Sequence, residues 1–176
     1  MLRLILNDEH LTGDLTEALG TCRHRLFIST ADVKDVHLPA ARGRARSIMR
    51  VFEDLAKRGV EVRLLHSGIP SGPFLEELKR HIPATLTMRR CPRVHAKAII
   101  VDGARMYLGS ANLTGAGLGA KSARRRNFEA GIWTDDLELI DPATDMLDRI
   151  WTGLECAACG RKAHCPVPLE EPERKR

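Results

Sequence analysis

Two short apolar segments on either side of Asp102-Gly103 constrain the fold of this chain more than any other feature. Residues 98–101 (AIIV) form an apolar run of the kind that builds a buried strand, and residues 104–108 (ARMYL) indicate a second strand. Asp-Gly is a favoured dipeptide for the two-residue turn of a β-hairpin. The sequence therefore predicts an antiparallel hairpin with its turn at Asp102-Gly103.

Polar side chains suited to phosphate chemistry flank this hairpin. His95 and Lys97 lie at the start of the first strand and point to the same face, because side chains alternate along a strand. A lysine ammonium suits a phosphoryl oxygen, and Ser110 and Asn112 are neutral donors that can stabilise charge on that group. A histidine can act as a nucleophile or a general acid near neutral pH. Each feature alone is common on solvated strands and loops, but together they indicate a phosphate-handling site.

The pattern H-x-K-x4-D-x6-G-S-x-N, which runs from His95 to Asn112, resembles the signature of the phospholipase D superfamily, also called the HKD family. The resemblance implies an α/β fold over residues 1–152, with a mixed β-sheet flanked by helices. It also implies that two such motifs face each other across a two-fold or pseudo-two-fold axis. One histidine then attacks phosphorus to give a phosphohistidine, and the other protonates the leaving oxygen. Lys97 and Asn112 bind the phosphate, and no metal is needed for catalysis.

The resemblance also assigns roles to two carboxylates. In the family a glutamate in a later strand orients the nucleophilic histidine, and Glu129 in the segment 127–132 matches it. Asp102 belongs to the signature, but the strand carries it several residues from His95, so we expect a structural role at the hairpin. The candidate catalytic set is His95, Lys97, Asp102, Ser110, Asn112 and Glu129.

The chain carries the signature once. Histidine occurs seven times, and only His95 is followed two residues later by lysine. Half of the two-histidine site is therefore present, and a homodimer with isologous contacts would complete it by bringing together two copies of His95. Such single-motif chains are similar to the small bacterial endonucleases of the superfamily. The alternative is a degenerate half that binds phosphate without turnover.

Charge favours nucleic acid as the substrate. The chain has 28 Lys and Arg against 23 Asp and Glu, and basic residues crowd the signature on both sides. Such clusters favour a polyphosphate backbone through counterion release. The candidate substrate-binding residues are Arg93, Arg124, Arg125 and Arg126.

Two alternatives to a nuclease stay open. A phospholipid-cleaving enzyme is less favoured, because aromatic residues make up only 4% of the chain and no amphipathic stretch offers an interfacial anchor. The other is a nucleic-acid-binding component of a bacterial defence complex, with weak or no catalysis.

The C-terminal residues 153–176 form a separate segment with its own chemistry. Cys-x-x-Cys-Gly followed by an adjacent His-Cys pair resembles a zinc knuckle, and Zn²⁺ favours such ligands in closed tetrahedral sites. Because His164 and Cys165 are adjacent, one of the two can be spare, with Cys91 or Cys22 completing the set; free thiols are the alternative. We expect a disordered tail after Pro166. The candidate zinc ligands are Cys156, Cys159, His164 and Cys165.

Strand-like and helical patterns alternate through the first half of the chain, which favours a mixed sheet flanked by helices. No apolar run reaches the roughly 18 residues of a membrane span, and the apolar start at residues 1–6 is too short for a signal-peptide core. We therefore expect a cytoplasmic protein with reduced thiols. The pattern predicts strands at 2–6, 25–31, 60–66, 84–90, 98–101, 104–108 and 127–133, and helices ending near 22, 58, 81 and 151. It predicts irregular structure at 32–45 and a start near Pro142 for the last helix.

Overall fold

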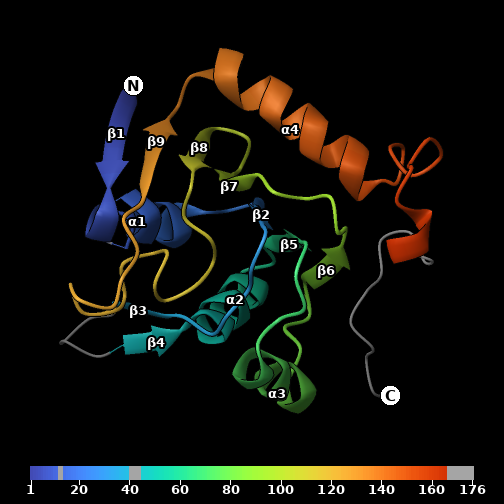
Figure 1. Ribbon diagram of the computed structural model, residues 1–176. Coiled ribbons are helices and arrows are strands. Elements are labelled where there is room, and N and C mark those ends of the chain that lie inside the picture. The colour runs from blue at the N-terminus through green and yellow to red at the C-terminus, as the bar shows by residue number, and fades with distance from the viewer. Residues whose placement is uncertain (12–13, 40–44, 166–176) are drawn as a thin grey trace.

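The computed structural model describes residues 1–11, 14–39 and 45–165, and its centre is a seven-stranded mixed sheet (Figure 1). The strands run in the order β1-β9-β8-β7-β2-β5-β6. They are β1 (Leu2–Leu6), β2 (Arg25–Thr30), β5 (Glu61–His66), β6 (Leu86–Arg90), β7 (Lys97–Val101), β8 (Arg105–Gly109) and β9 (Ala130–Thr134). The α/β architecture predicted from the sequence is confirmed.

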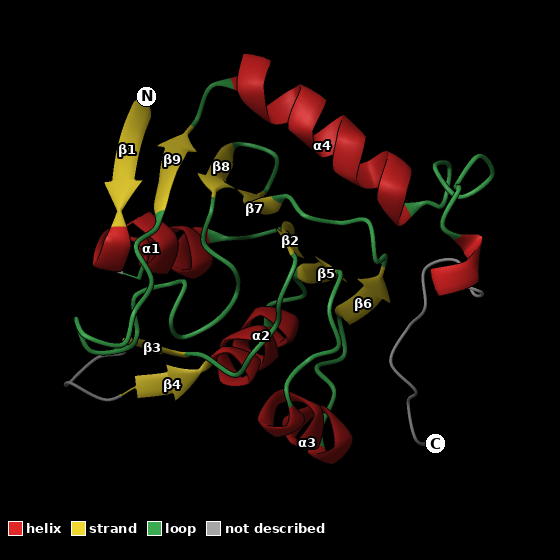
Figure 2. Ribbon diagram, viewed as in Figure 1, coloured by secondary structure: helices red, strands yellow, loops and turns green. Residues whose placement is uncertain are grey.

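Helices cover both faces of the sheet, as Figure 2 shows. On one face a large apolar core joins the sheet to three helices through side chains such as Leu19, Phe52 and Phe74. On the other face the longest helix packs Ile140 and Leu147 against a second core. The helices are α1 (Asp14–Thr21), α2 (Ile48–Lys57), α3 (Gly72–Arg80) and α4 (Leu137–Trp151), with 3-10 turns η1 (Asn7–His10) and η3 (Lys162–His164).

The directions of the strands make the two ends of the sheet, here called its edges, different from each other. Strands β2, β5 and β6 are parallel to one another, and β7 runs antiparallel to both β2 and β8. The carboxyl ends of β2 and β5 therefore meet the start of β7 and the end of β8 at one edge. In open α/β sheets, ligands bind outside the carboxyl ends of the parallel strands, so this edge is the natural place for a site.

The predicted hairpin forms at Asp102-Gly103, but three residues connect its strands instead of two, because Val101 pairs with Arg105. Asp102 and Gly103 have φ values of 54° and 67°, as the tight turn between two antiparallel strands requires. All five residues of β7 are buried, because β7 lies inside the sheet and is covered on both faces. A buried central strand of this kind explains the continuous apolar run in the sequence.

Several predicted boundaries were wrong. The strand predicted from residue 127 begins at Ala130, and the strand predicted from residue 84 begins at Leu86. Two further differences have identifiable reasons. The helix expected from Pro142 begins at Leu137, since the side chain of Asp136 accepts the backbone N–H of Glu138 at 3.0 Å and caps the helix there. Pro142 lies in the second turn, where it removes a single backbone donor. The segment 32–45, predicted to be irregular, contains the three-residue strand β3 (His37–Pro39), which pairs with β4 (Ala45–Ser47) at the end of that segment.

Strands of three residues are too short to produce a periodic signal. Residues 40–44, which connect them, and the charged tail predicted after Pro166 lie outside the described residues. None of the helices in the described part of the chain is both long and apolar enough to cross a bilayer.

Candidate active site

Four of the predicted catalytic residues meet at the edge where β2 and β5 end. Lys97 opens β7 and pairs with Gly109 at the end of β8. The loop after β8 carries Ser110 and Asn112, and Glu129 immediately precedes β9, which pairs with β8. His95 lies two residues before β7 with its side chain exposed to solvent. The signature hairpin thus delivers its polar residues to one edge of the sheet.

Lys97 is a buried cation with unused hydrogen-bonding capacity. Its side chain is 8% exposed, and its Nζ donates to the backbone carbonyl of His95 at 2.8 Å. Burial lowers the pKa of the Lys97 ammonium, and the charge of Glu129 acts in the opposite direction. An ammonium has three donors, so two have no acceptor among the described residues and can serve an anion. The bond to the carbonyl also fixes the backbone of His95.

Asn112 is oriented by its own amide oxygen. Its Oδ1 accepts hydrogen bonds from the backbone N–H of Ala31 at 3.0 Å and of Asp32 at 3.1 Å, and from the Thr30 hydroxyl at 3.2 Å. Three donors converging on one atom identify it as oxygen rather than nitrogen. The amide NH₂ is therefore presented away from the end of β2, where it can donate to a ligand.

Glu129 is held at the site by a serine and an asparagine. The Ser110 hydroxyl donates to Oε2 at 2.5 Å, and the Asn127 side-chain NH₂ donates to Oε1 at 2.9 Å. The carboxylate is only 8% exposed. The resemblance predicts a hydrogen bond between the imidazole of His95 and the carboxylate of Glu129. No such bond is found within the described residues. Ser110 was expected to donate a hydrogen bond to a phosphate, and in this structure its hydroxyl donates to Glu129 instead.

Two glycines and a tyrosine shape the loop after β8. Gly109 pairs with Gly131 across the strands, and the Tyr107 ring lies over both. A Cβ added at Gly109 would stand 2.3 Å from the Tyr107 hydroxyl oxygen, and one at Gly131 would stand 2.4 Å from the ring. That hydroxyl oxygen accepts the backbone N–H of Ala111 at 3.1 Å, so the tyrosine fastens the loop that carries Asn112. Burial raises the pKa of Tyr107 to about 12, which keeps the hydroxyl neutral.

The sequence did not reveal the supporting residues Tyr107, Thr30 and Asn127. Each acts through a contact between distant segments, and no local spacing signals such a contact. The Gly109 of the signature was the one available clue, because glycine inside a strand marks the close approach of another group.

Asp102 lies at the opposite end of the sheet from Lys97. Its carboxylate accepts three backbone N–H groups, from Arg23 at 2.9 Å, His24 at 2.8 Å and Arg25 at 2.9 Å. Burial alone would raise the pKa of Asp102, but these backbone bonds lower it overall. The aspartate of the signature therefore fixes the start of β2, apart from the other polar residues.

We expect Asp102→Asn to lower the free energy of unfolding by about 1–3 kcal/mol, because an NH₂ group replaces one accepting oxygen and the hydrogen bonds to the carboxylate charge are lost. Cleavage per folded molecule should stay within a factor of about two, since the residue is remote from His95. Because the native pKa is depressed, the stabilisation is present above the unfolded pKa of about 3.9 and is lost as pH falls through the native pKa. Urea unfolding at two pH values measures both effects. A stable but inactive variant would instead place Asp102 in the chemistry.

The predicted basic residues separate into different environments. Arg124 and Arg125 are exposed, whereas Arg126 forms an ion pair with Asp8 at 2.8 Å. Arg93 lines a pocket beside α4, where its guanidinium forms a hydrogen bond with Cys159. Arg124 and Arg125 are therefore the members of this set best placed to meet a polyanion.

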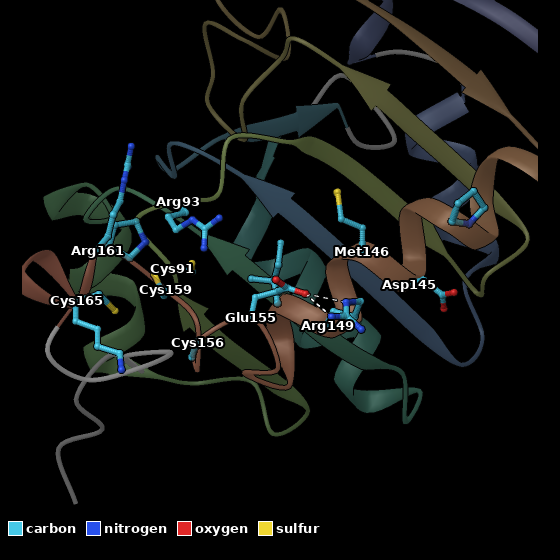
Figure 3. A pocket seen from close by; sticks show the side chains of 14 residues that line it. Cys91, Arg93, Asp145, Met146, Arg149, Glu155, Cys156, Cys159, Arg161 and Cys165 are labelled. Carbon is cyan, nitrogen blue, oxygen red and sulfur yellow. Dashed lines mark hydrogen bonds and ion pairs between the residues drawn. The ribbon is translucent and has the colours of Figure 1, made fainter.

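The five cysteines also lie in two different environments. Cys22 is buried at the start of β2, where its Sγ donates to Asp102 at 3.6 Å. The thiols of Cys156, Cys159 and Cys165 line one pocket together with Cys91, and the exposed His164 is outside that lining (Figure 3).

Solved structures share this fold. The phospholipase D family member Nuc from Salmonella typhimurium superposes with a TM-score of 0.65 and 14% identity, over 99% of this chain and all of its own. NucT from Helicobacter pylori gives a TM-score of 0.59 and 17% identity over 85% of this chain and 95% of its own. Phosphatidylserine synthase from Haemophilus influenzae Rd KW20 gives 0.52 and 14% over 84% of this chain and 38% of its own. At these identities the likeness establishes the fold alone.

Sequence comparison gives the family. No curated protein matches the chain, but a family model described as "Cardiolipin synthase, PLD-like domain" matches residues 15–151. That range includes the hairpin and every residue of the predicted catalytic set. The chain therefore belongs to the phospholipase D-like family, whose members are phosphodiesterases, as the signature from His95 to Asn112 indicated.

Proposed function

We propose that this chain is an endonuclease that cleaves the phosphodiester backbone of DNA or RNA at a site shared by two copies. The observation that carries the proposal is the amide of Asn112, whose oxygen is occupied by three donors and whose NH₂ is left for a ligand. Lys97, with two free donors, opens the neighbouring strand at the same edge. Such fixed donors suit the equatorial oxygens of a phosphoryl group in its transition state.

In the first step of the proposed reaction, a ring nitrogen of His95 forms a bond to phosphorus, and the bond from phosphorus to the leaving oxygen breaks. The leaving oxygen takes a proton from the imidazolium of His95 in the second copy. In the second step, that same imidazole takes a proton from water as the water oxygen attacks phosphorus and the P–N bond breaks. Both histidines return to their starting states, so no metal is required by this sequence of steps.

Glu129 orients the nucleophilic His95 in this proposal. Each carboxylate oxygen has two acceptor positions, and each accepts one hydrogen bond in this structure, from Ser110 or Asn127. An acceptor position therefore remains for an N–H of His95. Ser110 contributes by holding the carboxylate through its hydroxyl.

Nucleic acid fits the surface around the site better than a single phosphate ester. Arg124 and Arg125 are exposed in the loop that leads to Glu129, and the chain carries a net charge of +5. A polyphosphate gains affinity from each neutralised phosphate through counterion release. With its thiols reduced, we place this activity in the cytoplasm.

An apolar strip beside the site supports the shared arrangement. Leu4 pairs with Ile132, which pairs with Leu108, so these three side chains are neighbours on one face of the sheet. Leu6, next along β1, pairs with the first residue of β9, and Phe128 is 96% exposed beside Glu129. Exposed apolar patches of this kind mark interaction surfaces. We propose that a second copy covers this strip through an isologous contact and brings the two His95 residues together.

Leu4→Glu combined with Leu6→Glu should convert the dimer to a monomer and lower the cleavage rate about a hundredfold, because each monomer keeps only one of two catalytic histidines. Light scattering after size-exclusion chromatography measures the first effect, and nuclease assays measure the second. Leu137→Glu is the matched control, since that leucine is also exposed but opens α4 at the other end of β9. A fully active monomer would rule out the shared site.

The substrate class is tested by incubating the wild-type chain, with EDTA present, with single-stranded DNA, duplex DNA, RNA and phosphatidylcholine vesicles. Cleavage of one or more nucleic acids is expected. Cleavage of the lipid alone would overturn the nuclease assignment in favour of a phospholipase. Binding of nucleic acid without any cleavage would point instead to a binding component of a larger defence complex.

A further inference from the structure

Four of the five cysteines gather around one cavity on the side of the molecule away from the strip of exposed leucines. The cavity has a volume of about 820 Å³ and lies between α4, the segment after β6 and the C-terminal turns (Figure 3). Its lining includes Cys91, Cys156, Cys159 and Cys165, which come from three separate segments. All four are free thiols in this structure.

Backbone hydrogen bonds anchor these cysteines around the cavity. Cys91 ends the β6 segment, where its N–H donates to His66 at 2.8 Å and its carbonyl accepts from Val94 at 2.9 Å. Cys156 and Cys159 share one turn, closed by a bond of 3.2 Å from the N–H of Cys159 to the carbonyl of Cys156. Two cysteines separated by two residues on a turn are a recurring half of structural zinc sites.

The C-terminal turns have little else to stabilise them. After Trp151, none of the described residues up to Cys165 is buried. The carboxylate of Glu155 pairs with Arg149, but an exposed ion pair contributes little. A segment that buries no side chain lacks the usual source of folding free energy, and a structural metal ion supplies it in small segments of this kind.

The charges around the cavity complement a metal–thiolate centre. Four thiolates around Zn²⁺ carry a net charge of about −2, which needs nearby cations. Arg93, Arg161 and Lys162 line the cavity in addition to the paired Arg149, and the guanidinium of Arg93 already forms a hydrogen bond with Cys159. Hydrogen bonds from such groups to the ligating sulfurs are the usual support of a metal site.

We propose that Cys91, Cys156, Cys159 and Cys165 bind one structural Zn²⁺ ion, which fastens the C-terminal turns to the end of β6. Cys91 takes the place that the sequence suggested for His164, because His164 is exposed on η3 and does not line the cavity. Within the described residues, no three metal-ligating side chains form a cluster that could hold an ion as they stand. Zinc binding therefore draws the turn of Cys156 and Cys159 inward, toward the rigidly held Cys91.

The proposed centre also stabilises the approach to the active site. Only Pro92, Arg93 and Val94 separate Cys91 from His95. Fixing Cys91 to the C-terminal turns therefore limits the motion of the segment that carries the nucleophile. The role is structural, and the ion takes no part in phosphoryl transfer.

The metal content of the purified chain tests the proposed zinc site directly, without an activity assay. The full chain, purified under reducing conditions after expression with added zinc, should contain one zinc ion per chain by inductively coupled plasma mass spectrometry. Cys91→Ser and Cys165→Ser should each lower the zinc content at least about tenfold, since a structural site needs all four ligands. Cys22→Ser and His164→Ala are the matched controls and should keep the ion. Cobalt in place of zinc should give the visible spectrum of a tetrahedral tetrathiolate centre.

Three outcomes would overturn the proposed site. The first is a wild-type chain without zinc. The second is loss of zinc in His164→Ala with retention in Cys91→Ser. The third is a wild-type chain in which these four cysteines are paired as disulfides. Because Cys165 lies in a segment without buried side chains, its substitution leaves the fold of the sheet intact and keeps the measurement interpretable.

Discussion

His95→Ala is expected to lower the rate of phosphodiester cleavage by at least about a thousandfold, because the substitution removes both the nucleophile and the general acid from a shared site. His95 is exposed, and the hydrogen bond it makes within the described residues uses its backbone carbonyl, which accepts from Lys97. The melting temperature should therefore stay close to that of the wild type. Loss of activity with retained stability separates a catalytic role from a structural one.

The measurement compares initial rates on the nucleic acid that the wild type cleaves best, with EDTA present throughout. His81→Ala is the matched control, since His81 is also exposed but lies at the end of α3, where its backbone N–H donates to the carbonyl of Glu77. Mass spectrometry of rapidly quenched wild-type enzyme should detect a phosphoryl adduct on His95. Cleavage that persists in purified His95→Ala would place the nucleophile elsewhere.

The parts of the fold that depend on local chemistry were predictable from the sequence. The hairpin followed from an apolar run and from Asp102-Gly103, whose positive φ values the dipeptide tolerates well. The location of Lys97 and Asn112 at one edge of the sheet was predictable, because the signature fixes their spacing and the hairpin fixes where that spacing falls. Asp102 was expected to have a structural role away from His95, and it lies beyond the other end of the five-residue strand β7.

Long-range contacts explain most of what the sequence did not reveal. Ser110 was expected to donate to a phosphate, but its hydroxyl donates a hydrogen bond to Glu129, nineteen residues further along the chain. The side chain of Asp136 starts α4 five residues before Pro142, because the cap outweighs the loss of one backbone donor in the second turn. The placement of Cys91 beside the C-terminal cysteines likewise required the packing of α4 against the sheet.

Asn112→Asp should lower kcat/KM by about 10²–10³ while leaving the free energy of unfolding nearly unchanged. An aspartate keeps an oxygen where Oδ1 now accepts from Thr30, Ala31 and Asp32. The three hydrogen-bond donors at the end of β2 therefore keep their acceptor. The amide NH₂ is replaced by a second oxygen carrying negative charge. A donor to the phosphoryl oxygens thereby becomes a source of repulsion, and removing a single such donor typically costs this much in rate.

Asn112→Ala provides the comparison that separates the two roles of the side chain. Without Oδ1, the partly buried N–H groups of Ala31 and Asp32 lose their acceptor, which should destabilise the chain by about 1–3 kcal/mol. Both variants should lose activity, but only the alanine variant should lose stability, as measured by urea unfolding. An aspartate variant that cleaves like the wild type would show that the amide makes no contact with the phosphate. Because the oxygen of Asn112 is fully used by the protein, any effect of the aspartate on catalysis must come from the other half of the amide.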